Sequence, residues 1–258
     1  MKIKTIKQIK FSLIALLTLT NLSWYEPVVA KSQTQTSRSR NASRKPTRST
    51  KKPQIGDRRG RPTRRRGMGS RNDCPATDIP LTALIPENQV GQVVEAKPTF
   101  WLFIPYKSSE IPKGEFVLQD ENHNDVYRKD FPINKGEGIV GVSLASETSL
   151  ETNKIYQWYF KLYCEDSEST IPIYVRGWVQ RIALQPQQKK QLSRFTSPRQ
   201  RVAFYVNNGI WYSAFTELAK TCLPNPRNKN IEKGWSQLLG NVGLQDLSNK
   251  PIIGKISE

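Results

Sequence analysis

The sequence predicts a mainly β protein: an antiparallel β-sandwich, immunoglobulin-like or jelly-roll-like, packed with a C-terminal helical hairpin. Two observations indicate this fold. Between residues 81 and 184, short apolar runs alternate with turns rich in Pro, Gly and Asn, a pattern typical of sandwiches and barrels. After residue 184 the apolar side chains recur every three or four positions, which is the period of a helix.

Eight apolar runs are expected to form the strands. Alternation is clearest in the seventh run, where Tyr156, Trp158 and Phe160 share one face while Gln157 and Tyr159 share the other. Because successive side chains of a strand point to opposite faces, the first set is expected to be core. The runs cover residues 81–85, 90–96, 99–104, 115–119, 125–131, 139–144, 155–164 and 171–184.

The helical region is expected to begin at Ser197, which is followed by proline. Serine is a favoured N-cap, and proline suits the first helical position. One helix is predicted over residues 198–221, although Gly209 lowers the helix propensity of this stretch. A second helix around 231–239, followed by 244–247, completes a hairpin with enough apolar surface to pack on the sheet.

Net charge is unevenly distributed along the chain. The formal charge is +18, yet residues 31–71 hold fifteen Lys or Arg against the single Asp57, so this segment alone contributes +14. Too few apolar side chains are present there to offset the entropy of ordering the backbone. The expected organisation is a signal peptide over 1–30, a disordered basic linker over 31–71, the sandwich over 72–184, and a packed helical region over 185–258.

Residues 1–30 have the layout of a cleavable secretory signal peptide. Four lysines precede the apolar run 11–19, and Val28 and Ala30 supply the small residues that signal peptidase accepts. The alternative is a membrane anchor, but the apolar stretch is shorter than the roughly 18 to 20 residues that a spanning helix needs. We expect cleavage after Ala30 and a periplasmic or extracellular protein.

Three cysteines in an exported chain suggest one disulfide and one free thiol, with three pairings open. Cys74 begins the globular part and Cys164 ends the seventh apolar run. A bridge between them would tie the start of the folded chain to its core, so we expect Cys74–Cys164, with Cys222 unpaired.

The basic linker contains a short match to an AT-hook, Arg59–Pro62. In such hooks an Arg-Gly-Arg core enters the DNA minor groove. Export separates this chain from the chromosome, so nucleic acid is not the expected partner in the cell. The segment is instead expected to contact an anionic membrane surface or polysaccharide, the alternative being a solvated spacer. The candidate contact residues are Arg58, Arg59, Arg61, Arg64, Arg65 and Arg66.

The sequence presents no recognisable catalytic or metal motif. Residues 120–125 begin like a calcium loop, but Asp125 stands where glycine is needed and Phe131 where a bidentate Glu should close the site, so we expect a β-hairpin turn. His123 is the only histidine, and neither a nucleophile elbow, an HExxH helix nor a phosphate-binding loop is present. No cofactor and no catalytic residue is predicted, although two unspecified carboxylates could converge as in glycosidases.

Aromatic side chains are the remaining candidates for recognition. Trp158, Trp211 and Trp235 lie at core-like positions and are expected to be structural. Exposed rings on a sandwich face would stack on sugars or on a partner's side chains. The candidates for partner binding are Trp101, Tyr159, Tyr163 and Trp178.

Several motifs occur in a distinctive order: Gly69–Arg71 before Cys74, Pro98–Pro105, Tyr156–Tyr159, Gly177–Arg181, and Trp235–Leu239 with Val242–Leu244. Together they resemble domain of unknown function 928, a mainly cyanobacterial family of exported proteins, over about residues 65 to 253. The resemblance implies an exported envelope protein of a Gram-negative photosynthetic cell. It brings no established activity and no catalytic residues.

These observations favour a non-enzymatic, exported module that binds a protein or glycan of the cell envelope, with a basic tail that contacts anionic surfaces. Two alternatives stay open. One is a carboxylate-dependent hydrolase acting on envelope polysaccharide, and the other is a structural tether.

Overall fold

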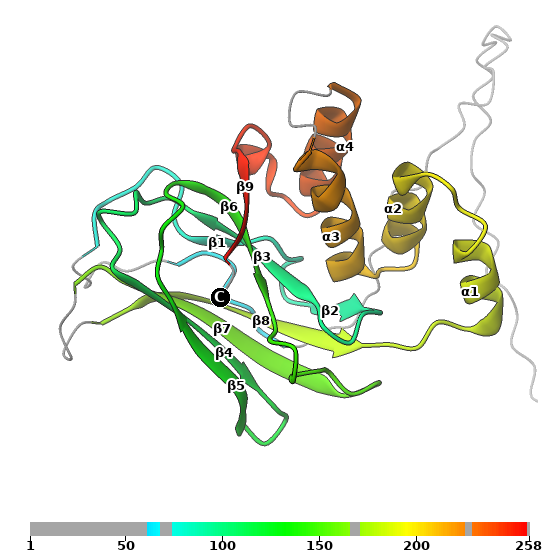
Figure 1. Cartoon of the computed structure of the whole chain (residues 1–258), viewed down its shortest axis with the longest axis horizontal. Coiled ribbons are helices and arrows are strands. Elements are labelled where there is room, and N and C mark those ends of the chain that lie inside the picture. The colour runs from blue at the N-terminus through cyan, green and yellow to red at the C-terminus, as the bar shows by residue number, and fades with distance from the viewer. Residues whose placement is uncertain (1–60, 68–73, 166–170, 225–228, 257–258) are drawn as a thin grey trace, which may run out of the picture. The chain divides into compact units, whose positions relative to one another are not determined.

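The computed structural model describes residues 61–67, 74–165, 171–224 and 229–256. Two sheets packed face to face form the centre of the fold, and helices cover one of them (Figure 1). The strands of the described chain are β1 (Thr82–Ala83), β2 (Val90–Val93), β3 (Thr99–Ile104), β4 (Lys113–Gln119), β5 (Asp125–Phe131), β6 (Gly138–Ser143), β7 (Ile155–Tyr163), β8 (Ile173–Arg181) and β9 (Ile252–Ile256).

The predicted sandwich is confirmed, although its sheets are mixed. One sheet has the order β1-β3-β6-β9 and the other β2-β8-β7-β4-β5. Most neighbours are antiparallel, as expected, but β2 pairs with β8 and β6 pairs with β9 in parallel. In both parallel pairs the partners lie far apart in sequence, which leaves room for the long crossover that parallel pairing requires.

Aromatic side chains fill the space between the sheets. The ring centroids of Phe100 on β3 and Phe116 on β4 lie 4.8 Å apart, and Trp158 on β7 stacks on Phe116 at 6.1 Å. Gly177 on β8 makes room for this tryptophan, because a Cβ there would lie only 2.6 Å from a Trp158 ring carbon. The core prediction for the inward face of β7 is therefore confirmed.

The described helices are α1 (Pro186–Leu192), α2 (Pro198–Asn207), α3 (Trp211–Cys222) and α4 (Lys229–Gly240), followed by the 3₁₀ turn η1 (Gln245–Leu247). Ser197 caps α2 as predicted, since its side chain accepts a hydrogen bond from the Gln200 backbone N–H. The single helix expected over 198–221 is wrong: α2 and α3 are separate. Gly209 adopts a φ of +71° between them, a conformation that glycine tolerates and a helix cannot contain.

Helices α3 and α4 pack on the face of the four-stranded sheet that points away from the five-stranded sheet, as Figure 1 shows. Trp101 and Phe103 of β3 contact this helical layer, whose side chains include Trp211 and Phe215. Strand β3 is therefore buried on both faces. Trp158, Trp211 and Trp235 are all buried, as predicted.

Residues 61–67 form a strap that joins the two sheets at one side of the sandwich. Arg64 exchanges backbone hydrogen bonds of 2.9 and 2.8 Å with Arg176 of β8. Further along, the Gly67 N–H donates to Leu81 O, and the Ala83 N–H of β1 donates to Arg65 O, both at 2.7 Å. These seven residues were expected to be disordered within the 31–71 linker, and they are instead paired with both sheets.

The predicted boundary between a sandwich over 72–184 and a helical region over 185–258 also differs from the structure. Strand β9 follows the helices and pairs with β6, so the C-terminal region contributes to the sandwich as well as covering it.

The disulfide Cys74–Cys164 is present, with the two Cα atoms 5.1 Å apart, and Cys222 is free and buried. Residues 1–30, with the predicted signal peptide, lie outside the described part of the chain, as do residues 31–60.

Candidate functional site

The outer face of the five-stranded sheet, hereafter the outer face, combines aromatic and charged side chains. It arises from the strict alternation of β7 and β8, whose apolar positions point into the core. The opposite positions pair across the strands as Gln157 with Trp178, Tyr159 with Arg176, and Lys161 with Tyr174. Such cross-strand neighbours stand about 5 Å apart at their Cβ atoms. The described residues of the outer face include Lys113, Glu115, Val117, Gln119, Arg128, Asp130, Gln157, Tyr159, Lys161, Tyr163, Tyr174, Arg176 and Trp178.

Strap arginines lie over two of these aromatic rings. The guanidinium carbon of Arg64 is 4.4 Å from the ring centroid of Tyr174, and that of Arg61 is 4.6 Å from the Trp178 ring. The Trp178 indole N–H donates to Pro62 O at 3.2 Å. Cation–π contacts of this kind contribute about 0.5–1 kcal/mol at exposed sites. The strap therefore extends the outer face and adds cations to it.

A buried carboxylate organises one side of the outer face. Glu115 of β4 accepts hydrogen bonds from Lys161 Nζ at 2.7 Å and from the Tyr163 hydroxyl at 3.0 Å, and it pairs with Arg128 of β5. Its side chain is only 8% exposed. The pKa of Lys161 is lowered mainly by burial and further by repulsion from Arg128. Glu115 thus holds two cations in place and is itself fully engaged.

Arg64 and Arg176 have no such partner. Among the described residues, neither guanidinium forms an ion pair, and Arg176 Nε is buried without a hydrogen-bond acceptor. Both lie beside tyrosine rings, because Arg176 pairs across the strands with Tyr159, whose ring centroid is 6.3 Å from that of Tyr174. The result is a cationic position flanked by aromatic rings, suited to an anionic group carried on a ligand whose ring has an apolar face, such as a sugar.

The predicted aromatic candidates divide between the surface and the core. Tyr159 and Tyr163 lie half-buried on the outer face. Trp178 shares that face but is only 9% exposed, because the strap covers it. Trp101 is unavailable to a partner, contrary to the expectation: it is 2% exposed beneath α3, and its indole N–H donates to Thr216.

Two residues of the outer face, Tyr174 and Arg176, are absent from the sequence-based candidates. The signal for both was present, since they alternate with buried Ile173 and Val175 in the run over residues 171–184. Because alternate residues of a strand share a face, Tyr174 and Arg176 are expected on the same face as Trp178. Arg64 was a candidate contact for anionic surfaces, but its pairing with β8 could not be predicted, because nothing in a basic low-complexity segment marks where it pairs with a sheet.

Of the arginines expected to contact anionic surfaces, Arg61, Arg65 and Arg66 have polar partners in the fold, whereas Arg64 lies over the Tyr174 ring. Arg65 donates to Val242 O at 2.5 Å, its side chain is 10% exposed, and burial lowers its pKa. Arg66 pairs with Asp246 at 2.7 Å, and Arg61 with Glu121 at 3.4 Å. Arg58 and Arg59 lie outside the described residues. Arg65 and Arg66 therefore fasten the strap to the helical side of the fold.

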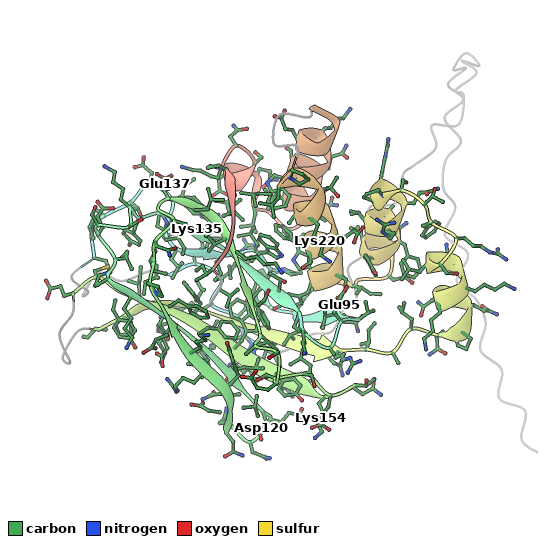
Figure 2. All side chains as sticks on the ribbon, viewed as in Figure 1. Glu95, Asp120, Lys135, Glu137, Lys154 and Lys220 are labelled. Atoms are coloured by element: carbon green, nitrogen blue, oxygen red, sulfur yellow. A yellow bond between two sulfur atoms is a disulfide. The ribbon has the colours of Figure 1, made fainter. Side chains whose placement is uncertain are left out.

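The 120–125 segment forms the β4–β5 hairpin turn, as predicted, and Figure 2 places Asp120 at its tip. Asp120 accepts hydrogen bonds from the backbone N–H groups of Asn122 and Asn124 at 2.8 and 2.9 Å. The Asn124 hydrogen bond is the main cause of its lowered pKa. His123 is exposed in this turn with a φ of +64°. Within the described chain, no three His, Cys, Asp or Glu side chains gather as metal ligands.

The hydrolase alternative depends on the carboxyl groups. A glycosidase needs a general acid with a raised pKa. Among the described residues, the two carboxyl groups with a clearly displaced pKa are Asp120 and Glu147, and both values are lowered, the latter chiefly by a hydrogen bond from the residue's own backbone N–H.

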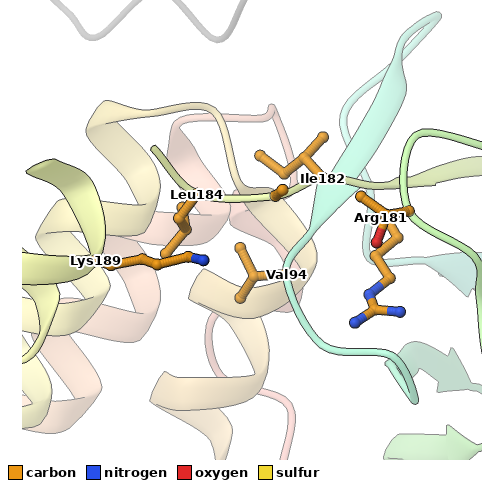
Figure 3. Close-up of a pocket in the computed structure, with 7 residues that line it drawn as sticks. Val94, Arg181, Ile182, Leu184 and Lys189 are labelled. Carbon is orange, nitrogen blue, oxygen red and sulfur yellow. The ribbon is translucent and has the colours of Figure 1, made fainter. Parts of the chain in front are cut away.

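A shallow pocket of about 360 Å³ lies where β8 leads into α1. Figure 3 shows Lys189 of α1 reaching toward Val94 and Leu184, with Arg181 at the other side. Arg181 already donates to Leu150 O at 2.8 Å. This pocket is separate from the outer face and has no aromatic lining.

Comparison with known protein families gives a match. The family described as Domain of Unknown Function (DUF928) matches residues 66–252, which include β1 to β8, the helices and the end of the strap. No curated protein matches the chain. None of the helices in the described ranges has both the length and the apolarity needed to cross a membrane.

Proposed function

Because the chain belongs to the DUF928 family, whose description names no activity, we propose its function from the geometry of the outer face. The protein is an exported, non-enzymatic binding module that recognises an anionic glycan of the cell envelope. The proposal rests on one observation: guanidinium groups without an ion-pair partner among the described residues alternate with tyrosine rings on a sheet face that α3 and α4 leave uncovered.

Each part of the outer face has a role in this proposal. Tyr159 and Tyr174 supply flat apolar surface on which sugar rings stack. Arg176 and Arg64 supply the charge-assisted hydrogen bonds that carboxylate, sulfate or phosphate groups accept. Glu115 keeps Lys161 and Arg128 fixed, so the surroundings of these residues are rigid before a ligand arrives.

Export and the basic tail belong to the same proposal. The lysine-rich start and the Val28–Ala30 site direct the chain across the inner membrane, and the disulfide Cys74–Cys164 suits an oxidising compartment. The basic residues of segment 31–60 concentrate the protein near anionic material through sequence-independent attraction, while the outer face supplies the specific contact.

Binding of the processed chain to dextran sulfate and to neutral dextran tests this proposal. Segment 31–60 attracts any polyanion, so the decisive comparison is between variants that all retain it. Arg176→Gln removes a guanidinium from the outer face, and Lys190→Gln makes the same change of charge at an exposed position on α1. Measurement by surface plasmon resonance at about 0.15 M salt limits long-range attraction to roughly 8 Å.

We expect Arg176→Gln to weaken binding to dextran sulfate by about 10-fold or more, since a hydrogen bond to a charged group contributes about 1.5–3 kcal/mol. Lys190→Gln should change the affinity less than about twofold, and Tyr174→Ala should weaken binding through lost stacking. Equal effects of Arg176→Gln and Lys190→Gln would show that only net charge matters and would overturn the proposal.

A further inference from the structure

A second surface lies on the opposite side of the molecule, between helices α2 and α4. A half-open groove of about 580 Å³ runs between these helices, with α3 as its floor. Val202 and Val206 of α2 face Leu238 of α4 across it, and Leu218 of α3 lies at the bottom. The groove is therefore apolar inside and bounded by two helices.

The dimensions of the groove match those of a short helix. Its α2 wall extends from Pro198 to Asn207, and its other wall from Lys233 of α4 to Asn241, the residue after α4. At about 1.5 Å of rise per residue, these walls are roughly 12 to 14 Å long. The side chains at positions i, i+4 and i+7 of a docked helix span about 10 Å, which the groove accommodates.

Gly234 leaves the backbone of α4 accessible from the groove. Glycine is unfavourable in the interior of a helix, and nothing among the described residues requires it here: an added Cβ would meet only Leu218 Cδ1 of these residues, at 3.8 Å. Together with Ala203 on the opposite wall, it keeps the groove wide and its backbone accessible. Small residues of this kind allow a second helix to pack closely.

The rim of the groove is cationic. Arg199 and Lys233 both line it and are exposed, and no Asp or Glu lies among its described lining residues. Within the described ranges neither cation is engaged in an ion pair or side-chain hydrogen bond. A basic segment such as residues 31–60 is excluded as occupant, because it is repelled by the rim and has almost no apolar side chains.

We propose that the groove between α2 and α4 binds an amphipathic helix of a partner protein, with its apolar face in the groove and acidic residues on its flanks. The apolar floor takes the anchoring side chains, Gly234 admits the partner's backbone, and Arg199 and Lys233 pair with the acidic flanks. Helix-in-groove recognition has this distribution of apolar anchors. The surface is distinct from the outer face, so the module would hold two ligands at once.

Peptide binding to the processed full chain tests the proposal. The probe is a fluorescein-labelled peptide of about 14 residues with Leu at three- and four-residue spacing and Glu on the flanks. One comparison peptide carries Lys in place of Glu, and another retains Glu but has Ser in place of Leu. Fluorescence anisotropy gives the affinities, and circular dichroism reports helix formation on binding.

Two substitutions in the groove have matched controls. Gly234→Phe fills the groove, whereas Gly240→Phe makes the same change at the end of α4, outside the lining. Arg199→Glu with Lys233→Glu reverses the charge of the rim, whereas Lys189→Glu with Lys190→Glu makes an equal change on α1. Thermal unfolding of each variant confirms that it is folded.

We expect the Glu-flanked peptide to bind at least about tenfold more tightly than either comparison peptide. Gly234→Phe should weaken its binding at least tenfold, and the reversed rim should prefer the Lys-flanked peptide, while both controls behave like the unaltered chain. Binding unaffected by Gly234→Phe, or equal binding of the Leu-free peptide, would overturn the proposal. So would sedimentation as a dimer that Gly234→Phe dissociates, since the occupant would then be a second copy of this chain.

Discussion

The disulfide Cys74–Cys164 should contribute strongly to stability because it closes a long loop. Its two cysteines are 90 residues apart in sequence. Removing the bridge by Cys74→Ser with Cys164→Ser frees the unfolded chain between them, while the native side chains around it stay in place. The double substitution also avoids leaving an odd thiol that could exchange with Cys222.

The magnitude follows from the length of the loop. The chain-entropy relation gives about 4.6 kcal/mol at 25 °C for a loop of about 90 residues. For a domain of this size, each kcal/mol shifts the melting temperature by about 2–4 °C. The double variant should therefore melt roughly 9 to 18 °C below the parent chain.

Thermal unfolding followed by far-ultraviolet circular dichroism measures this shift. The reduced parent chain should melt at the same lowered temperature as the double variant. Cys222 serves as an internal probe: it is buried, and burial raises the pKa of its thiol to about 11, so it should react with a thiol reagent only when the chain unfolds. A melting temperature within about 3 °C of the parent's would refute the loop-entropy reasoning.

Three further predictions concern the outer face, the strap and the helical layer. Glu115→Gln leaves Lys161 without its buried counter-charge, so urea unfolding should show a loss of about 2 kcal/mol; an unchanged midpoint would contradict the role assigned to this carboxylate. A processed chain lacking residues 61–67 should show red-shifted tryptophan fluorescence, because the strap covers Trp178; an unshifted spectrum would count against that cover. Tyr205 is buried and its pKa is raised to about 12. Since the unfolded tyrosine releases its proton near pH 10 while the folded one keeps it, the free energy of unfolding should fall between about pH 10 and 12, and less steeply in Tyr205→Phe.

Much of the sandwich could be predicted because its information is local. Strands β3 and β5 begin and end where their apolar runs do, and alternation in β7 assigned each side chain to the correct face. The disulfide was also within reach, because only three pairings existed. The strand limits and faces depend on the spacing of residues within one short segment, and the sequence shows that spacing directly.

Other features depend on partners distant in sequence. Helix α1 has no buried residue, and β9 is short and contains Gly254, so neither has a periodic pattern to mark it. The burial of Trp101 has the same origin. Strand β3 is apolar at every position, and a continuous apolar run is covered on both faces, but the helix that covers Trp101 lies more than a hundred residues later.

The strap gives four of the chain's basic residues fixed positions and separate roles. As a single basic tail, the segment 31–71 would contribute only screened, non-specific attraction. The structure separates Arg61, Arg64, Arg65 and Arg66 from the rest, because backbone pairing of residues 64–67 with β8 and β1 fixes where these side chains lie. Arg65 and Arg66 serve the fold, whereas Arg64 lies beside Tyr174 with no carboxylate partner in the described chain. Because backbone hydrogen bonds hold residue 64 in place, the Arg64 side chain loses less conformational entropy on binding than it would in an unpaired segment. Salt should therefore weaken the part of binding that depends on residues 31–60 more steeply than the part that depends on Arg64 and Arg176.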